Sequence, residues 1–412
     1  MKFEDYNIAD EIKSNLTKMG LLRPTDIQFK SIPAILKGED VLAIAQTGTG
    51  KTAAFAIPVI ERIQRSRNAK REDGIRCVVM VPTRELAIQI SQAFERISKG
   101  TKVKIFGLYG GVDQDAQIQK LSKQVDVLVS TPGRMFDLAS QGYIHFNRVE
   151  QLILDEADHM LALGFIKDIQ DLIKMLPKKR QTLFFSATID EKIKKVAYSL
   201  VNKPIRIQIS PKDPVSKNVE HFVAFVEMDD KRFFLERVVD ENPDKKILVF
   251  VRTKVRAERV LAAMQRVDIK ADTIHSGKEQ SQRNTVMSDF RSGKNNLLIA
   301  TDVTARGIDI PNVDYVVNYD LPEDPEFYVH RVGRTGRGKN KGQAMSFCST
   351  EEKELLKEIE TYVSKPIRVL EIDKVAYADT VELSASQERD WKSLIVNEET
   401  RPKPAKKKKK KK

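Results

Sequence analysis

The stretch Ala45-Gln46-Thr47-Gly48-Thr49-Gly50-Lys51-Thr52 decides how the rest of the chain is interpreted. It follows an aliphatic run, 41–45, that predicts a buried strand, and it precedes an amphipathic stretch, 53–64, that predicts a helix. Glycines in such a loop let backbone N–H groups curl around phosphate oxygens at the helix N-terminus, where Lys51 reaches the β- and γ-phosphates and the Thr52 hydroxyl ligates Mg²⁺. Because alanine replaces the usual first glycine, the loop alone leaves a plain glycine-rich turn open. Its place between strand and helix favours a nucleoside triphosphate site.

Short apolar runs recur on both sides of this loop, separated by longer amphipathic stretches. This rhythm predicts buried parallel strands joined by helices. The runs are 41–45, 77–81, 105–109, 125–129, 152–154, 182–185, then 221–226, 247–251, 272–275, 297–300, 315–319 and 344–348. Between the two series, Pro204, Pro211 and Pro214 stand among lysines and indicate an exposed linker. We therefore predict an α/β protein with two tandem doubly wound parallel sheets: residues 1–207, a linker at 208–217, residues 218–372, and a mostly disordered tail at 373–412.

Bulk composition agrees with this division and excludes several classes. A chain of 412 residues is longer than one hydrophobic core usually serves, so two domains are expected. No apolar run reaches the length needed to cross a bilayer, and the first residues lack the apolar region of a signal peptide, so we expect a cytoplasmic protein. Cys77 and Cys348 lie far apart and form neither a disulfide framework nor a zinc pattern.

The net charge of +13 is concentrated at one end of the chain. Residues 401–412 carry nine positive charges and no acid, so the remaining 400 residues carry only +4. Such a basic tail binds phosphate groups without reading sequence. The alternative is a solvated tail that only aids solubility.

A second candidate site follows the run 152–154, which continues as Asp155-Glu156-Ala157-Asp158. Ligands of parallel sheets bind at the carboxyl ends of the strands, where these acids stand. Asp155 can hold Mg²⁺ partly through water, and Glu156 can orient and deprotonate an attacking water. An acid at a strand end can instead merely cap the following helix. Together with Lys51, the acids predict an ATPase or a GTPase.

These residues also carry a family resemblance. Asp155 to Asp158 spell the signature of the DEAD-box RNA helicases, and the surrounding motifs match that family in order and spacing from about Phe3 to Phe347. The resemblance, to a bacterial type with a minimal core, implies two RecA-like domains, ATP as substrate and Mg²⁺. Residues 1–29 resemble the Q motif, in which Gln28 would read adenine and so favour ATP over GTP. Leu21 stands where the family usually has an aromatic residue, so adenine packing would be aliphatic.

The resemblance assigns further residues to the nucleotide. Arg334 and Arg337 match arginines that contact the γ-phosphate, where they neutralise developing charge. Asp309 matches the residue that binds ribose. The implied catalytic set is Lys51, Glu156, Arg334 and Arg337; the implied ATP-binding set is Phe3, Arg23, Gln28, Gln46, Thr47, Gly48, Thr49, Gly50, Lys51, Thr52, Asp155 and Asp309.

Other matching segments correspond to RNA-contacting and coupling motifs. Hydroxyls, backbone amides and arginines grip phosphate and sugar without base specificity. The implied RNA set is Pro82, Thr83, Arg84, Gly111, Thr131, Pro132, Gly133, Arg134, Arg252, Thr253, Gln280, Arg283, Thr301 and Asp302. Ser186, Thr188, Asp158 and His330 are implied to couple hydrolysis to strand separation. Taken singly, several of these are ordinary turns or caps, and 280–283 could be the solvent face of a helix.

The implied function is an ATP-dependent RNA helicase. RNA would stimulate ATP hydrolysis, and domain closure would locally open short duplexes or remodel RNA–protein complexes without processive movement. Ribosomal precursors and the RNA-decay machinery are family-compatible partners, and cold adaptation is a further family-compatible process. Two rivals remain open: a DNA translocase of the same architecture, and an RNA clamp that binds ATP without turnover.

Overall fold

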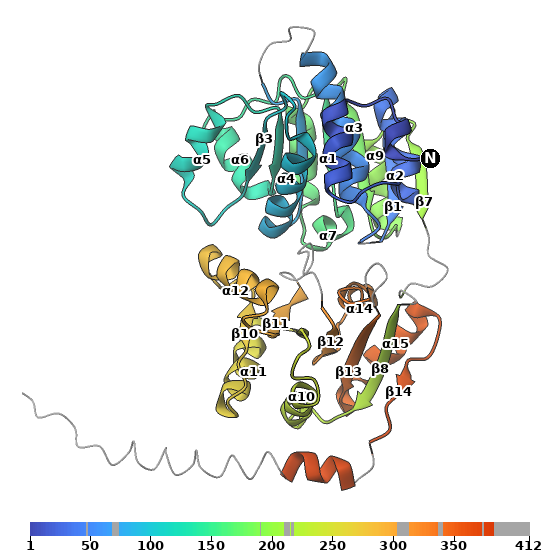
Figure 1. Cartoon of the computed structure of the whole chain (residues 1–412), viewed down its shortest axis with the longest axis vertical. Helices are drawn as coiled ribbons and strands as arrows, with labels where there is room; N and C mark the ends of the chain where they lie inside the picture. Colours follow the sequence, from blue (N-terminus) through green and yellow to red (C-terminus); the bar gives the residue numbers. More distant parts are fainter. Residues whose placement is uncertain are drawn as a thin grey trace, which may run out of the picture.

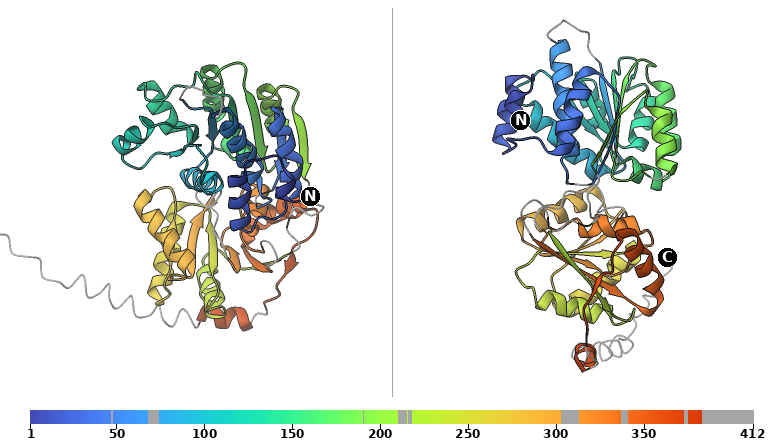
Figure 2. Two further views of the ribbon diagram at one scale, coloured as in Figure 1. Left: turned by 45° about the horizontal axis from the view of Figure 1, so that its top comes forward. Right: turned by 90° about the vertical axis from the view of Figure 1, so that its right-hand side faces the viewer.

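The computed structural model describes residues 1–46, 48–67, 74–189, 191–209, 215, 218–302, 313–336, 341–372 and 375–382. Its core consists of two seven-stranded parallel sheets, one after the other along the chain (Figure 1). Helices cover both faces of each sheet (Figure 2). No helix within these ranges is long and apolar enough to cross a membrane.

The first sheet has the strand order β3-β4-β2-β5-β6-β1-β7. Its strands are β1 (Val41–Ala45), β2 (Cys77–Met80), β3 (Ile105–Leu108), β4 (Val127–Ser130), β5 (Gln151–Leu154), β6 (Gln181–Ser186) and β7 (Ile205–Ile209). Alternate residues of β1 enter different apolar clusters, Val41 and Ala43 on one face and Leu42 on the other. Burial on both faces explains the continuous apolar runs in the sequence.

The helices of the first unit precede and connect these strands. They are η1 (Phe3–Asp5), α1 (Asp10–Lys18), α2 (Asp26–Lys37), α3 (Lys51–Arg67), α4 (Arg84–Ser98), α5 (Gln114–Leu121), α6 (Pro132–Ser140), α7 (Ala157–Ala162), α8 (Ile166–Met175) and α9 (Glu191–Leu200).

The second sheet repeats the same strand order as β10-β11-β9-β12-β13-β8-β14. Its strands are β8 (Val219–Phe225), β9 (Ile247–Val251), β10 (Asp272–Ile274), β11 (Leu297–Thr301), β12 (Tyr315–Asn318), β13 (Gly342–Cys348) and β14 (Arg368–Val369). Its helices are α10 (Lys231–Asp240), α11 (Lys254–Arg266), α12 (Gln280–Ser292), α14 (Pro325–Val332), η2 (Thr350–Glu352) and α15 (Lys353–Val363). The predicted fold class, two tandem doubly wound sheets, is confirmed.

Two edge strands were not predicted. β7 pairs with β1 as far as Ile209, so the first two positions of the predicted linker lie in a strand. β7 has only one buried residue, Ile207, and β14 is two exposed residues long. Neither therefore shows the continuous apolar pattern of the central strands. Most of the remaining predicted linker, 210–214 and 216–217, lies outside the described residues.

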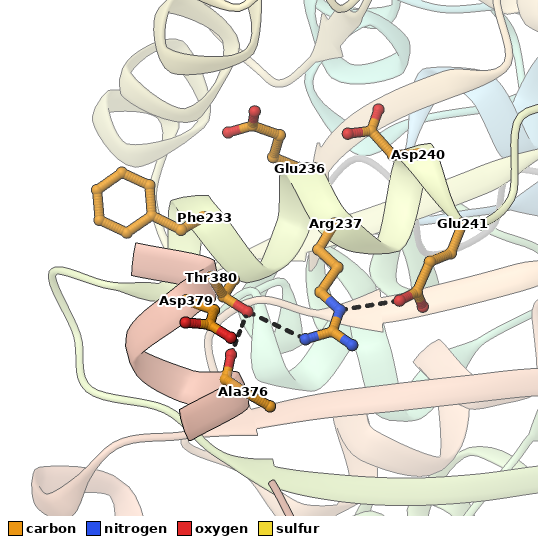
Figure 3. Close-up of a pocket in the computed structure, with 8 residues that line it drawn as sticks. All are labelled: Phe233, Glu236, Arg237, Asp240, Glu241, Ala376, Asp379 and Thr380. Carbon is orange, nitrogen blue, oxygen red and sulfur yellow. Dashed lines mark hydrogen bonds and ion pairs between the residues drawn. The ribbon is translucent and has the colours of Figure 1, made fainter. Parts of the chain in front are cut away.

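The C-terminal region begins with a short helix. Residues 375–382 are helical, at the start of the segment for which the sequence predicts a mostly disordered tail. This C-terminal helix packs on α10. The Tyr377 hydroxyl donates to Asp230, the N-cap of α10, at 2.7 Å. Figure 3 shows Arg237 of α10 donating to the Thr380 hydroxyl at 3.0 Å. Residues 383–412, including the basic tail, lie outside the described residues.

Candidate active site between the two sheets

The candidate site lies at the carboxyl ends of three neighbouring strands. β5, β6 and β1 are adjacent in the first sheet, and each continues into a segment singled out from the sequence. β1 leads into the phosphate loop, β5 leads into Asp155, and β6 ends at Ser186. The sheet thereby brings together residues that are far apart in the chain.

The phosphate loop is braced by the N-cap and first turn of α2. Gln28 donates from Nε2 to the Gly50 carbonyl at 3.0 Å and accepts from the Thr25 backbone N–H at 3.0 Å. The Thr25 hydroxyl donates to the Thr49 carbonyl at 2.8 Å. Gly50 has φ +94°, and a Cβ there would lie 2.4 Å from Gln28 Nε2, so glycine is required. Gln28 therefore holds the loop directly.

Lys51 opens α3 directly behind the loop. Its side chain is buried, and its ammonium nitrogen has no hydrogen-bond partner within the described part of the chain. A buried ammonium group without a partner is costly, and phosphate oxygens would satisfy it. Thr52 follows in the first turn of the same helix. The position fits a phosphate group well.

Asp155 and Glu156 are both buried beside this lysine. Burial, with the nearby Glu156 charge, raises the pKa of Asp155 to about 7, although Lys51 and the Glu156 backbone N–H oppose the shift. Burial alone would also raise the pKa of Glu156, but His159, Lys51 and Arg334 together lower it to about 2. The two neighbouring carboxyl groups therefore have pKa values shifted in opposite directions.

The donors available for Mg²⁺ are oxygen atoms. No group of three or more His, Cys, Asp or Glu side chains in the described ranges is arranged to hold a metal ion. Mg²⁺ usually keeps several waters and takes one or two carboxylates plus substrate phosphates. The Thr52 hydroxyl and the Asp155 carboxylate fit such a partial set.

Asp158 connects the acidic stretch to the end of β6. One carboxylate oxygen accepts from the backbone N–H groups of Ala187 and Thr188 at 3.0 and 3.2 Å and from the Thr188 hydroxyl at 3.4 Å. The Ser186 hydroxyl is buried and has no hydrogen-bond partner among the described residues. Of the hydroxyls of Ser186 and Thr188, only that of Thr188 hydrogen-bonds to Asp158.

The same threonine reaches the second sheet. Its hydroxyl lies 3.4 Å from Glu326 Oε2, and Glu326 Oε1 lies 3.5 Å from His330 Nε2. Arg334 is buried, and its positive charge acts on Glu156 across the boundary between the two units. A cavity of about 260 Å³ lies here, lined from both units by residues that include Gln46, Thr188 and His330.

The first-domain residues predicted to bind RNA cluster at the ends of β2 and β4. Thr83 and Thr131 are the N-caps of α4 and α6, and Pro132 is the first residue of α6. The Arg84 guanidinium lies against Gly111, where a Cβ would meet it at 2.1 Å. Arg134 donates to Gln117 at 2.7 Å. Pro82 and Gly133 flank these caps.

The predicted RNA set of the second domain is arranged differently. Arg252 and Thr253 follow β9, with Arg252 donating to Glu352 at 2.8 Å and Thr253 capping α11. Thr301 ends β11, and both oxygens of Asp302 accept from Arg331 at 2.6 Å. This salt bridge occupies the Asp302 carboxylate.

Gln280 and Arg283 lie at the boundary between the two domains. Gln280 donates to Glu85 at 3.4 Å, and Arg283 forms a salt bridge with the same carboxylate. Both side chains are buried, so the alternative of a solvent-facing helix surface is wrong for these two residues, whereas Ser281 and Gln282 between them are exposed. Glu85 directly follows the predicted RNA-binding residue Arg84 but received no predicted role, because its partners are distant in sequence.

Three predicted site residues, Thr47, Asp309 and Arg337, lie outside the described residues. Arg23 is exposed. Phe3 is only 3% exposed and packs in the core against Tyr6, with its backbone N–H donating to the Leu22 carbonyl at 3.3 Å. That burial ties the N-terminal segment to the Q-motif region and leaves little of the Phe3 ring for a ligand.

Fold and site together define a class of protein. The chain has two RecA-like units whose sheets share one strand order. The first carries a phosphate loop and strand-end acids, and an arginine and a histidine of the second lie toward them. This is the architecture of a tandem nucleoside triphosphatase. Residues 25–196 match the family model "DEAD/DEAH box helicase", and residues 230–339 match "Helicase conserved C-terminal domain". The chain belongs to the DEAD-box family of ATP-dependent RNA helicases.

Curated relatives and solved structures agree. The chain is 39% identical over 370 residues to the ATP-dependent RNA helicase CshA of Listeria monocytogenes, covering 90% of this chain and 70% of the relative. It is 39% identical over 358 residues to the DEAD-box ATP-dependent RNA helicase CshA of Bacillus subtilis, covering 87% and 72%. S. cerevisiae Dbp5 bound to RNA and ADP BeF3 superposes with TM-score 0.81 at 27% identity, covering 94% of this chain and 98% of that one. DEAD-box helicase Mss116 bound to ssRNA and UDP-BeF gives 0.82 at 26% identity, covering 96% and 84%. The predicted family is confirmed.

Proposed function

We propose that this chain is an RNA-dependent ATPase that couples ATP hydrolysis to local, non-processive opening of short RNA duplexes or to remodelling of RNA–protein complexes. The observation that carries the proposal is the buried Lys51 ammonium, without a hydrogen-bond partner in the described ranges, beside Asp155 and Glu156. In this proposal residues 1–207 bind ATP, and residues 218–372 close on it.

The proposed chemistry assigns a role to each side chain of the site. Lys51 and the loop amides bind the phosphates. Thr52 and Asp155 would hold Mg²⁺, which would supply charge neutralisation at the phosphate oxygens. Glu156 accepts a proton from water as the water oxygen bonds to the γ-phosphorus. The bond from that phosphorus to the oxygen bridging to the β-phosphate breaks, and ADP leaves with the electron pair of this bond. Arg334 neutralises charge on the phosphoryl group in transit.

The roles of several residues rest on family resemblance alone. In this proposal Arg337 also contacts the γ-phosphate, and Asp309 holds the ribose. Arg23 and Gln28 form the adenine side of the site, and the buried Phe3 supports it from behind through its backbone bond to Leu22. Gln28 also braces the loop through its bond to Gly50.

RNA is the proposed partner because of the relatives and because of the residues at the strand ends. The Dbp5 and Mss116 structures, which superpose over both units of this chain, are bound to RNA. Arg84 and Arg134 in the first unit and Arg252 in the second are suited to phosphate and sugar. Selection of RNA over DNA would come from 2′-hydroxyl contacts. We propose a cytoplasmic location, with ribosomal precursors or the RNA-decay machinery as physiological partners.

The basic tail is proposed to raise RNA affinity. Nine positive charges within residues 401–412 would release counterions from the RNA backbone. Deleting 401–412 is expected to weaken RNA binding and to flatten its salt dependence, while RNA-saturated turnover stays intact. Filter binding between about 50 and 200 mM salt measures both effects. An unchanged salt slope would make the tail a bystander.

The primary test is steady-state ATP hydrolysis without nucleic acid, with single-stranded RNA and with DNA of matched sequence. We expect RNA, but not DNA, to stimulate ATP hydrolysis strongly. The Glu156→Gln variant should show no RNA-stimulated hydrolysis. Equal stimulation by DNA would favour a translocase. ATP and RNA binding without any turnover would favour a clamp.

A further inference from the structure

His159 lies beside the proposed proton acceptor. It stands three residues after Glu156, directly behind the acidic stretch, and is only 2% exposed. Its Nδ1 lies 3.5 Å from Glu156 Oε2. The proposed chemistry assigns His159 no role, and its sequence position carried no motif signal.

Neither of these two atoms has a hydrogen-bond partner at standard geometry in the part of the chain that the structure describes. Both are buried, and a buried polar atom without a partner is energetically unfavourable. The two atoms are each other's available partners. Hydrogen bonds in ligand-free active sites are often long and shorten when the substrate binds. A small rotation of either side chain makes this contact a hydrogen bond.

The backbone holds the pair together. Glu156 is the N-cap of α7 and has φ +51°, a left-handed conformation that non-glycine residues adopt rarely. The Met160 N–H donates to the Glu156 carbonyl at 3.0 Å, and the His159 N–H donates to Asp158 Oδ1 at 2.9 Å. Residues three apart at the start of a helix lie on one face. Glu156 and His159 are therefore presented to each other by the first turn of α7.

We propose that His159 is a positioning residue for Glu156: its Nδ1–H donates to Oε2 and leaves Oε1 to accept the proton of the attacking water. This inference rests on the proposed function, in which Glu156 is the proton acceptor. A carboxylate free to rotate would spend less time aligned with the water, and small misplacements of reacting groups slow catalysis strongly. The positive charges of Arg334 and Lys51 also attract the Glu156 carboxylate. A hydrogen bond from His159 to one oxygen would then select a single orientation of this carboxylate.

The alternative is a histidine that merely fills the core next to Met160. A structural role would lower stability and nucleotide affinity when the ring is replaced. A positioning role would lower turnover selectively. The two roles therefore predict different measurements on the same variants.

The experiment compares His159→Phe, which keeps a ring of similar size, with His159→Asn, whose side-chain amide nitrogen can take the place of Nδ1. His145→Phe is the matched control, because His145 is exposed in the same domain. In full-length protein with Mg²⁺ and saturating single-stranded RNA, kcat and KM for ATP are measured. Binding of a fluorescent ADP analogue and the thermal midpoint complete the set.

We expect His159→Phe to lower kcat about 10- to 100-fold, with KM and ADP affinity changed less than about twofold. His159→Asn should recover most of kcat, and His145→Phe should match the wild type. Wild-type kcat in His159→Phe would overturn the positioning role. So would equal losses of kcat, ADP affinity and thermal midpoint in both His159 variants. Absence of RNA-stimulated hydrolysis in the wild type would overturn the proposed function itself, and this inference with it.

Discussion

Asp155 and Glu156 are neighbours in the chain, yet their surroundings separate their acidities. Burial raises the pKa of Asp155 to about 7, whereas His159, Lys51 and Arg334 outweigh burial and lower that of Glu156 to about 2. Phosphate groups would compete for Lys51 and Arg334. We expect the pKa of Glu156 to rise when ATP binds, which would improve it as a proton acceptor.

The raised pKa of Asp155 predicts a pH-dependent change in stability. Because the folded chain holds this proton more tightly than the unfolded chain, the contribution of Asp155 to stability is lost as pH rises from about 4 to about 7. Asp155→Asn abolishes this pH-dependent loss of stability, because asparagine does not ionise. Without nucleotide and with EDTA, it should raise the thermal midpoint by about 2 °C or more at pH 8 and by less at pH 5.

Differential scanning fluorimetry across this pH range measures the effect. Asp244→Asn is the control, because Asp244 is exposed in the second domain. An equal shift for Asp155→Asn at pH 5 and pH 8 would show that ionisation of Asp155 does not destabilise the fold.

At the scale of elements, α2 and the phosphate loop act as one unit. The two hydrogen bonds of Gln28 join the N-cap of α2 to Gly50. Gln28→Ala is expected to weaken ATP binding about 30-fold, because both hydrogen bonds of the buried amide are lost, each contributing about 1 kcal/mol. Isothermal titration with a non-hydrolysable analogue measures it. Gln119→Ala on the exposed face of α5 is the control. Unchanged ATP affinity in Gln28→Ala would show that α2 and the phosphate loop do not act as one unit.

The C-terminal helix, residues 375–382, is expected to stabilise the second domain. Tyr377 and Val381 pack on its core, and Tyr377 and Thr380 form hydrogen bonds to α10. A chain ending at Ile372 should lose about 2–4 kcal/mol of stability in that domain relative to the full chain. A chain ending at Glu382 should lose little. Urea denaturation followed by circular dichroism compares the three, and equal midpoints would contradict the assignment.

At the scale of the whole molecule, two units whose sheets have identical strand order lie next to each other (Figure 2). Contacts that join them each include a predicted site residue and a partner that was not predicted: Thr188 contacts Glu326, and both Gln280 and Arg283 contact Glu85. ATP and RNA, which both contact the two units in the proposed function, would favour the same closed arrangement. Each ligand should then strengthen binding of the other.

The contact between Glu85 and Arg283 predicts non-additive mutational effects. Glu85→Ala and Arg283→Ala should each lower RNA-stimulated kcat about 10-fold, and the double variant should be little worse than either. The expected coupling is about 1–3 kcal/mol, because both side chains are largely buried. Glu95→Ala and Arg291→Ala, exposed on the same helices α4 and α12, are the matched controls. Additive losses would show that the two residues act independently.

Local patterns in the sequence determined the central strands, the phosphate loop and the acids at the end of β5. A strand buried on both faces of its sheet is a continuous apolar run, and a phosphate loop has glycines at fixed spacing. Each of these sequence signals therefore lies within a few consecutive residues. The edge strands β7 and β14 carry no such signal, because they are short and largely exposed. The C-terminal helix shows its role only where Tyr377 meets α10.

Only the tertiary structure decided which motif residues contact each other. Gln280 and Glu85 are 195 positions apart, and nothing near either one indicates that they pair. Arg331 donates hydrogen bonds to both carboxylate oxygens of Asp302, and the buried His159 lies beside Glu156. Sequence periodicity reports which face of an element is buried. The partner of a buried charge depends on how separately folded elements are placed, and that information is distributed over the whole chain.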